Sequence, residues 1–163
     1  MINKEAIKYL ESLDPNYVIG GSVAVMLYLG YDIRKCNDLD IHILNHIDDS
    51  NCLKQLFGKD VHIQYDHPEF SIISGINVLK LEDIITYKIN RLMLKDIYDL
   101  SYLLKLNYDI NKIKITSKKE IRGDDYIFDD KSDFYEVLNF ENAKKLIDNL
   151  RIKISNCKKS HYS

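Results

Sequence analysis

The pattern of apolar and polar positions divides the first half of the chain into short helices and strands. Apolar residues three and four apart predict helices, whereas short apolar runs or strict alternation predict strands. The predicted elements are a helix at Lys4–Leu13, a strand at Tyr17–Ile19, a helix over Val23–Leu29, a strand at Asp38–Leu44, a short helix from Ser50 to Phe57, and strands at Val61–Tyr65 and Phe70–Ser74. Ser22 occupies the N-cap position of the second helix, which ends near Gly30.

The second half of the chain is predicted to be mainly helical. Leu81–Leu94 carries an apolar stripe, and further helices are predicted at Asp96–Leu106 and from about Phe140 to Ile154, before a polar and frayed end. Because a small mixed sheet precedes a cluster of helices, the predicted fold class is α+β with a helical C-terminal half. We expect a core at 1–106 with a helical region, 107–163, packed on it, forming one domain overall.

Length and composition restrict the class of protein. The 163 residues are 45% hydrophobic and 29% charged, which excludes a disordered chain. No apolar run approaches the roughly 20 residues of a membrane span, so no membrane partner is expected. Cys36, Cys52 and Cys157 form no zinc or disulfide pattern, which favours a reducing, cytoplasmic location.

The distribution of charge limits how the protein could bind nucleic acid. The net charge is −2, so binding would require a local basic patch. Lys112–Arg122 carries five positive side chains and one negative, and Asp124–Glu136 carries six negative and one positive. The alternative is that the basic segment is a solvated turn offset by its acidic neighbour.

The segment from Tyr17 to His42 contains the residues with the clearest chemistry. Glycine at positions 20 and 21 permits close approach of a ligand, and the first amides of the following helix suit a phosphate. Ser22 could donate its hydroxyl to the same phosphate. Asp38 and Asp40 share one face of the predicted strand, where their like charges favour a pair of Mg²⁺ ions. Each pattern alone has a simpler interpretation, a tight turn and a solvated strand edge, but together they predict a site for a triphosphate and its metals.

These residues resemble the signature of the nucleotidyltransferase superfamily. Gly20-Gly21-Ser22 precedes a helix, and Arg34-Lys35-Cys36-Asn37-Asp38-Leu39-Asp40 is similar to the Arg-x-Ser/Thr-x-Asp-Leu-Asp run of its AbiEii-type, or MenT-like, toxin branch. Cys36 stands where that branch has Ser or Thr. The resemblance implies that Gly20, Gly21, Ser22 and Arg34 bind the nucleotide and that Asp38 and Asp40 hold the metals.

A later part of the chain extends the resemblance. The family carries a Lys on a helix, then an Arg, then a Lys/Arg-Asp-x-x-Asp-Leu motif, which Lys88, Arg91 and Lys95–Leu100 match. The resemblance implies that Lys88 and Arg91 contact the nucleotide, that Asp96 contacts substrate or orients Lys88, and that Asp99 is more structural.

The spacing of the same residues is compatible with more than one role. Lys88, Arg91 and Lys95 would share one face of a continuous helix. That face could simply be solvated. Alternatively, Asp96 and Asp99 could be structural partners of Arg91 or Lys88.

The resemblance also implies a third carboxylate, which usually completes the metal site of this superfamily and can act as the base. Asp66 is the candidate, because it would share a face with His62 and Gln64 on the strand expected beside Asp38–Leu44. The alternative is a turn residue ahead of Pro68. His42 and His62 would flank the metals or be ordinary strand histidines.

The resemblance implies an enzyme that transfers a nucleoside monophosphate from an NTP to an acceptor hydroxyl. The acceptor would be RNA, at a tRNA 3′ end, or a protein, and the enzyme would be a toxin with a cognate antitoxin. One alternative is an antibiotic nucleotidyltransferase, although such enzymes usually lack the later Lys-Asp-x-x-Asp-Leu motif. Another is a catalytically silent binding module of the same fold.

Overall fold

The computed structural model describes residues 2–126 and 137–162, and their contacts form two compact units, Met1–Lys80 and Leu81–Ser163. The division into a core at 1–106 and a helical region at 107–163 stays a prediction. Each unit has its own core.

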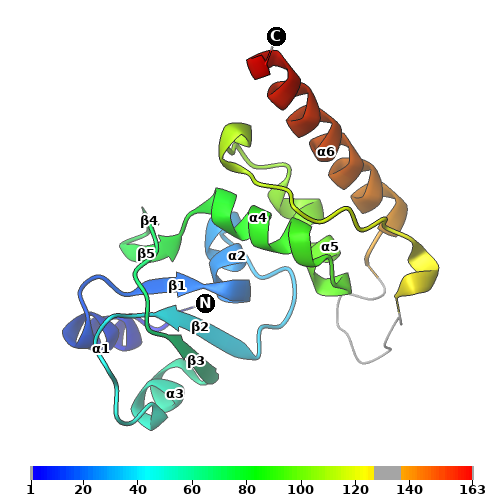
Figure 1. Cartoon of the computed structure of the whole chain (residues 1–163). Coiled ribbons are helices and arrows are strands. Elements are labelled where there is room, and N and C mark those ends of the chain that lie inside the picture. Colours follow the sequence, from blue (N-terminus) through cyan, green and yellow to red (C-terminus); the bar gives the residue numbers. More distant parts are fainter. Residues whose placement is uncertain (1, 127–136, 163) are drawn as a thin grey trace. The chain divides into compact units, whose positions relative to one another are not determined.

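The first unit contains a five-stranded mixed sheet and three helices (Figure 1). Its elements are α1 (Lys4–Leu13), β1 (Val18–Gly20), α2 (Gly21–Leu29), β2 (Asp38–His42), α3 (Asn51–Phe57), β3 (Asp60–Gln64), β4 (Phe70–Ile73) and β5 (Ile76–Leu79). The strand order is β3-β2-β1-β5-β4, in which β1–β2 and β4–β5 are antiparallel and the other pairs are parallel. The predicted small mixed sheet is therefore confirmed.

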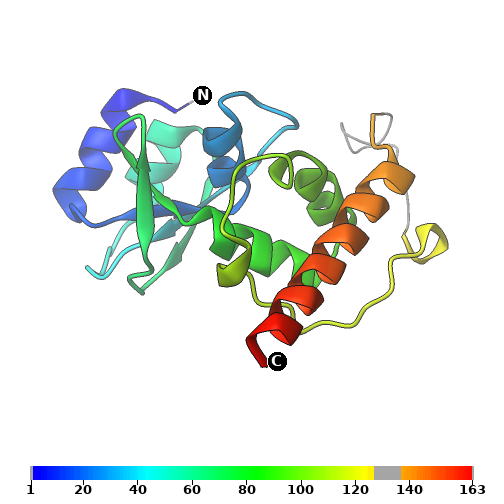
Figure 2. The same ribbon diagram turned by 90° about the horizontal axis from the view of Figure 1, so that it is seen from above.

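The alternation in β2 separates a buried face from a polar face. Leu39 and Ile41 are fully buried, whereas Asp38, Asp40 and His42 project from the opposite face. The apolar helix α2 contacts β1, β2 and β5, and α1 packs with α3. Figure 2 shows these three helices on the same side of the sheet, which leaves the polar face of β2 on the other side.

The turn from β1 into α2 differs from the prediction. The helix begins at Gly21, with Gly20 at the N-cap and no side-chain cap, so the prediction that Ser22 is the N-cap is wrong. The reason is the positive φ of Gly21, +61°, which turns the chain directly from the strand into the helix. Ser22 therefore lies within the first turn.

Strand β5 was not predicted. A two-residue turn, Ser74-Gly75, joins it to β4, and both residues have positive φ, 51° and 79°. Turns of this kind match the twist of a hairpin. Serine rarely adopts a positive φ, so Ser74 does not by itself predict a hairpin of this kind.

The second unit contains α4 (Leu81–Arg91), α5 (Leu94–Leu103), two short 3₁₀ turns, η1 (Ile110–Lys112) and η2 (Gly123–Asp125), and the long helix α6 (Phe140–Tyr162). Helix α5 packs against both α4 and α6. The apolar core of the second unit includes Ile85, Ile89, Ile97, Leu100, Leu103, Ala143, Ile147 and Leu150. The helical character predicted for this half is confirmed.

Two helix boundaries in this unit contradict the prediction. The helix expected through Leu94 ends at Arg91, because Leu92 has a φ of 51°. Lys88 and Lys95 therefore lie on different helices, and the shared face expected of a continuous helix does not exist. The end of the chain after Asn156, predicted to be frayed, continues as helix to Tyr162.

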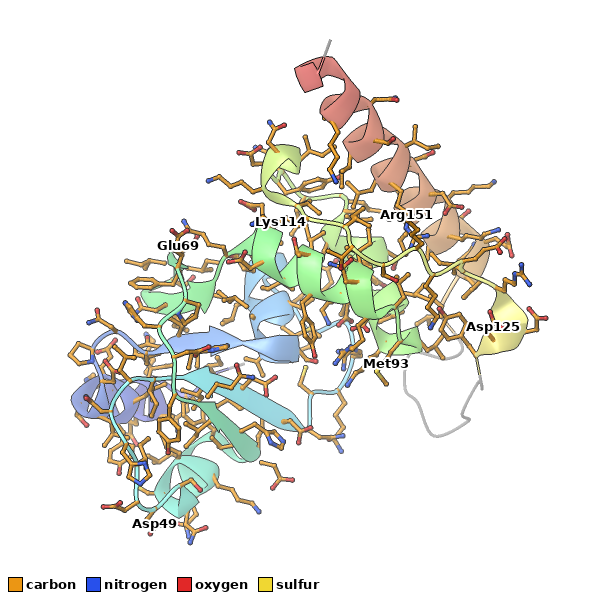
Figure 3. The ribbon with its side chains drawn as sticks, viewed as in Figure 1. Asp49, Glu69, Met93, Lys114, Asp125 and Arg151 are labelled. Carbon is orange, nitrogen blue, oxygen red and sulfur yellow. The ribbon has the colours of Figure 1, made fainter. Side chains whose placement is uncertain are left out.

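The segment that follows η1 runs along α4. The Asn90 side chain accepts hydrogen bonds from the amides of Thr116 and Ser117 and donates one to the carbonyl of Lys114. Figure 3 labels Lys114 on this segment. The carbonyl of Leu92 accepts hydrogen bonds from Lys119 Nζ and the Tyr126 hydroxyl. Most of the predicted acidic run, from 127 to 136, lies outside the described residues.

Within the described ranges, no helix combines the length and apolar character needed to cross a membrane.

Candidate functional site

The polar face of β2 brings the two predicted metal-binding carboxylates together. Asp38 and Asp40 alternate with buried Leu39, so both project from the same face. In the parallel pairing with β3, Asp38 lies opposite Asp60 and Asp40 lies opposite His62. His62 Nε2 lies 3.7 Å from Asp38 Oδ1, and the Asp38 side chain is 56% exposed. The Asp38 carboxylate is therefore accessible to an ion or ligand from solvent, and Asp40 beside it is partly exposed.

Gly21 lies directly against the Asp40 carboxylate. A Cβ atom added to Gly21 would overlap Oδ2 of Asp40 and would lie 2.9 Å from its Cγ. Backbone pairing brings the two together, because Gly20 is the partner of Asp40 in the β1–β2 ladder. Glycine is thus required here both by its positive φ and by the closeness of the carboxylate.

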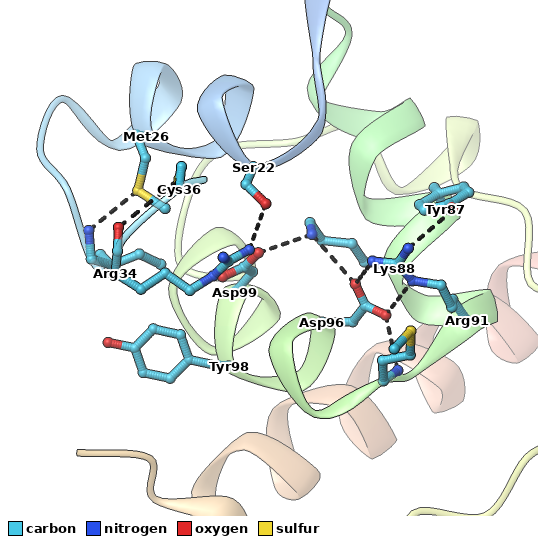
Figure 4. Close-up of polar contacts among 12 residues, drawn as sticks. Ser22, Met26, Arg34, Cys36, Tyr87, Lys88, Arg91, Asp96, Tyr98 and Asp99 are labelled. Atoms are coloured by element: carbon cyan, nitrogen blue, oxygen red, sulfur yellow. Dashed lines mark hydrogen bonds and ion pairs between the residues drawn. The ribbon is translucent and has the colours of Figure 1, made fainter. Parts of the chain in front are cut away.

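The start of α2 presents backbone amides beside this carboxylate. Its N-cap, Gly20, provides no side chain to accept hydrogen bonds from the first-turn amides. Arg34 Nη2 donates a 2.6 Å hydrogen bond to Ser22 Oγ (Figure 4). The Ser22 hydroxyl, which accepts this bond, still has its own hydrogen to donate to another group. The predicted nucleotide-binding residues Gly20, Gly21, Ser22 and Arg34 therefore lie at one corner of the first unit.

The predicted third carboxylate contacts a histidine. Asp66 Oδ1 lies 2.6 Å from His42 Nδ1, and the His42 side chain is only 11% exposed. In the parts of the chain that the structure describes, no three His, Cys, Asp or Glu side chains are grouped to hold a metal ion. The role of Asp66 as a metal ligand stays a prediction.

Lys88, Arg91, Asp96 and Asp99 form an ionic cluster at the junction of α4 and α5. Lys88 Nζ lies 2.9 Å from Asp99 Oδ2 and 3.4 Å from Asp96 Oδ1 (Figure 4). Arg91 binds both oxygens of Asp96 at 2.7 Å, and the Met93 amide donates to Asp96 Oδ2. The two carboxylates thus have the structural partners that the sequence had left open.

Burial distinguishes this cluster from a solvated helix face. Asp96 and Asp99 are fully buried and Lys88 is 3% exposed, so the solvated-face interpretation is wrong for Lys88. Burial raises the pKa of Asp96, but hydrogen bonds and charge from Arg91, the positive charge of Lys88 and the Met93 amide together hold that pKa below its ordinary value. Asp96 therefore stays ionised within the core.

The surroundings of Arg91 include a residue that sequence reasoning missed. The Arg91 guanidinium lies 4.8 Å from the ring centroid of Tyr87 and donates to its hydroxyl. The signal was available, because positions four apart meet on a helix. Contact of Lys88 or Arg91 with a nucleotide stays a prediction.

Two solved structures from Helicobacter pylori are similar to this chain along nearly its whole length. The crystal structure of a candidate nucleotidyltransferase from H. pylori superposes with a TM-score of 0.55 and 17% sequence identity, covering 96% of this chain and 99% of the other. The crystal structure of JHP933 from H. pylori gives a TM-score of 0.55 and 17% identity, covering 99% and 98%. At this identity the similarity shows a nucleotidyltransferase-like fold.

No family model and no curated protein sequence matches the chain. The two H. pylori structures confirm the general fold predicted from the motifs. The AbiEii or MenT-like branch stays a prediction.

Proposed function

We propose that this protein is a Mg²⁺-dependent nucleotidyltransferase that moves a nucleoside monophosphate from an NTP to an acceptor hydroxyl and releases pyrophosphate. The observation that carries the proposal is the placement of the Asp40 carboxylate against Gly21, at the uncapped start of α2. Metal-binding oxygens and phosphate-binding amides then meet at one corner, as a metal–triphosphate complex requires.

The residues present fit Mg²⁺ that enters together with its nucleotide. Mg²⁺ prefers oxygen ligands and is commonly bound by one or two carboxylates together with substrate phosphates. Asp38 and Asp40 supply two carboxylates on one strand face. When bound, two such ions would neutralise charge on the reacting phosphoryl group and activate the acceptor hydroxyl.

The chain's own groups bind and orient the triphosphate in this proposal. The first-turn amides of α2 donate to its oxygens at the positive end of the helix dipole. Ser22 Oγ is held by Arg34 at 2.6 Å and directs its hydrogen toward the phosphates. Arg34 adds positive charge close to the same oxygens.

The ionic cluster has a different part in the proposal. Lys88, Asp96 and Asp99 are buried and Arg91 is partly exposed, and the charges of the two cations and two carboxylates balance within the second unit. We assign Lys88 and Arg91 to the nucleotide, as the family resemblance implies, and assign Asp96 to orienting both of them through the contacts described above.

The acceptor is proposed to be RNA, a tRNA 3′ end, with a protein hydroxyl as the alternative. Lys112, Lys114 and Lys118 are exposed on the segment that follows α5, which suits a polyanion. The family resemblance adds the expectation of a toxin with a cognate antitoxin. An antibiotic nucleotidyltransferase and a silent binding module are the competing functions.

A labelling experiment tests the proposal. The purified protein is incubated with each α-³²P-labelled NTP, Mg²⁺, and either total tRNA or cell lysate. Label in RNA supports the leading proposal, and label in protein supports its alternative. Label in an added aminoglycoside supports the antibiotic enzyme. No label with any acceptor, together with no binding of Mg²⁺–NTP, would refute the transferase and favour the binding module.

A further inference from the structure

His42 lies between a carboxylate and the start of α2. Its Nδ1 and Asp66 Oδ1 are 2.6 Å apart, and the Asp66 side chain is 55% exposed. Because the carboxylate accepts, Nδ1–H donates, and this bond fixes both the tautomer and the orientation of the ring. Asp66 therefore determines where the other edge of the imidazole lies.

The other edge of the His42 ring packs on Gly20. A Cβ atom added to Gly20 would lie 3.0 Å from His42 Nε2 and 3.4 Å from Cδ2, so the ring occupies the space of a side chain at position 20. Gly20 is extended, with φ −119°, and is the N-cap of α2. Its neighbour Gly21 then turns with φ +61° against Asp40. The ring thus supports the backbone from which the first helical amides project.

We infer that Asp66 and His42 are positioning residues for the phosphate-binding turn Gly20-Gly21. Asp66 holds the imidazole, the imidazole holds Gly20, and Gly21 is thereby kept against Asp40. The inference rests on the proposed function for the identity of the ligand. It assigns Asp66 a role through His42 in place of the predicted role as a third metal ligand.

The two roles predict different behaviour for asparagine at position 66. An Asn side chain keeps an oxygen that can accept from His42 Nδ1, but it lacks the charge that a Mg²⁺ ligand supplies. If Asp66 positions His42, triphosphate binding should therefore be kept in Asp66→Asn and weakened in Asp66→Ala. If Asp66 is a metal ligand, binding should be weakened in both variants. Since Asp66 is more than half exposed, both variants are expected to fold.

The first measurement is the affinity for a non-hydrolysable triphosphate, titrated at several Mg²⁺ concentrations. Asp66→Ala should weaken binding about tenfold, the scale of losing a charge-assisted hydrogen bond or an outer-shell partner. The Mg²⁺ concentration at half-maximal binding should not change, and Asp66→Asn should bind as the wild type does. Equal loss in both variants, with a raised Mg²⁺ requirement, would overturn the inference in favour of a metal ligand.

The second measurement needs no nucleotide. The backbone amide signals of the six glycines are followed by ¹⁵N relaxation. Asp66→Ala should increase the mobility of Gly20 and Gly21 and leave Gly58 and Gly75 unchanged, whereas Asp66→Asn should change none. Unchanged Gly20 and Gly21 in Asp66→Ala would refute the inference even if nucleotide binding fell. If the wild type bound no triphosphate, the proposed function would fail, and the glycine signals would still test the positioning role.

A second histidine–aspartate pair in the same unit provides the control. His46 Nε2 lies 3.2 Å from Asp48 Oδ1, and both side chains are largely exposed, at 74% and 96%. Asp48→Ala removes a histidine–aspartate contact in which His42 takes no part. It should leave both measurements at the wild-type values, and an effect equal to that of Asp66→Ala would contradict the proposed path through His42.

Discussion

The α-carbon of Gly21 lies so close to the carboxylate of Asp40 that a methyl group on Gly21 would overlap Asp40 Oδ2. The contact joins the end of β1 to the face of β2. It leaves one carboxylate and the first amides of a helix side by side, without an intervening side chain.

Gly21→Ala should therefore remove triphosphate binding as well as stability. Alanine at a positive φ costs about 1–2 kcal/mol, and the added methyl must also displace the Asp40 carboxylate. We expect a loss of unfolding free energy greater than this strain alone, and no measurable binding by isothermal titration.

Gly30→Ala is the matched control at the other end of the same helix. Gly30 has φ +81°, but a Cβ atom there would have nothing within 4 Å. It should show only the backbone strain, about 1–2 kcal/mol, with normal triphosphate affinity. Equal losses of stability and affinity in the two variants would show that the clash with Asp40 is not the cause of the losses in Gly21→Ala.

The metal proposal predicts that Asp38→Ala and Asp40→Ala each lower transfer at least a hundredfold, on the order of losing a stabilising charge interaction in the transition state. The melting temperature should change little or rise slightly, because each substitution removes one of two like charges on a strand face. Asp60→Ala is the control, since Asp60 lies opposite Asp38 but pairs with Lys54 at 2.8 Å. Near-normal turnover in Asp40→Ala would contradict the proposed metal site.

The buried ionic cluster makes a prediction about stability. Lys88→Met leaves Asp99 and Asp96 without one of their cations, and breaking a buried ion pair costs about 3–5 kcal/mol. The double variant Lys88→Met, Asp99→Leu removes both members of the 2.9 Å pair and should recover much of that loss. Urea unfolding at neutral pH measures both. Glu120→Gln, in an exposed pair with Arg122, should change stability by less than about 1 kcal/mol.

The same cluster gives a pH dependence with a defined sign. The pKa of Asp96 is lower in the folded chain than its ordinary value, so its contribution is fully present above about pH 4, near the unfolded pKa. That contribution is lost as the pH falls through the folded pKa. The difference in unfolding free energy between wild type and Asp96→Asn should therefore be constant from pH 7 to about pH 4.5 and shrink below that. A difference that shrinks above pH 5 would contradict the lowered pKa.

Local patterns predicted the polar face of β2 but not the geometry around it. Alternation was sufficient for Asp38 and Asp40, because strand side chains alternate whatever they contact. The contact of Asp66 with His42 depends on how the chain folds after β3, which no local spacing specifies.

The α4–α5 junction shows why the rest could not be predicted. Leucine is an unfavourable residue for positive φ, so a helix break at Leu92 has no sequence signal. Likewise, a stripe of charged residues normally indicates a solvent-exposed helix face. Here, mutual pairing allows Lys88, Asp96 and Asp99 to be buried. In both cases tertiary contacts, rather than local preference, determine the structure.

The last prediction concerns the acceptor and uses the exposed lysines of the second unit. Lys114 and Lys118 lie on the segment whose backbone is hydrogen-bonded to the Asn90 side chain of α4, so charge reversal there should not disturb the fold. Lys114→Glu with Lys118→Glu should weaken tRNA binding, reduce its salt dependence and leave triphosphate affinity unchanged, because each phosphate contact contributes to the slope of affinity against salt. Lys4→Glu with Lys8→Glu, on the exposed side of α1, makes the same change in net charge and should have a smaller effect. Labelled-tRNA binding from low to physiological salt compares the two variants with the wild type. Equal losses in both would indicate only non-specific attraction, and a flat salt response with full transfer activity would exclude RNA and favour a protein or small-molecule acceptor.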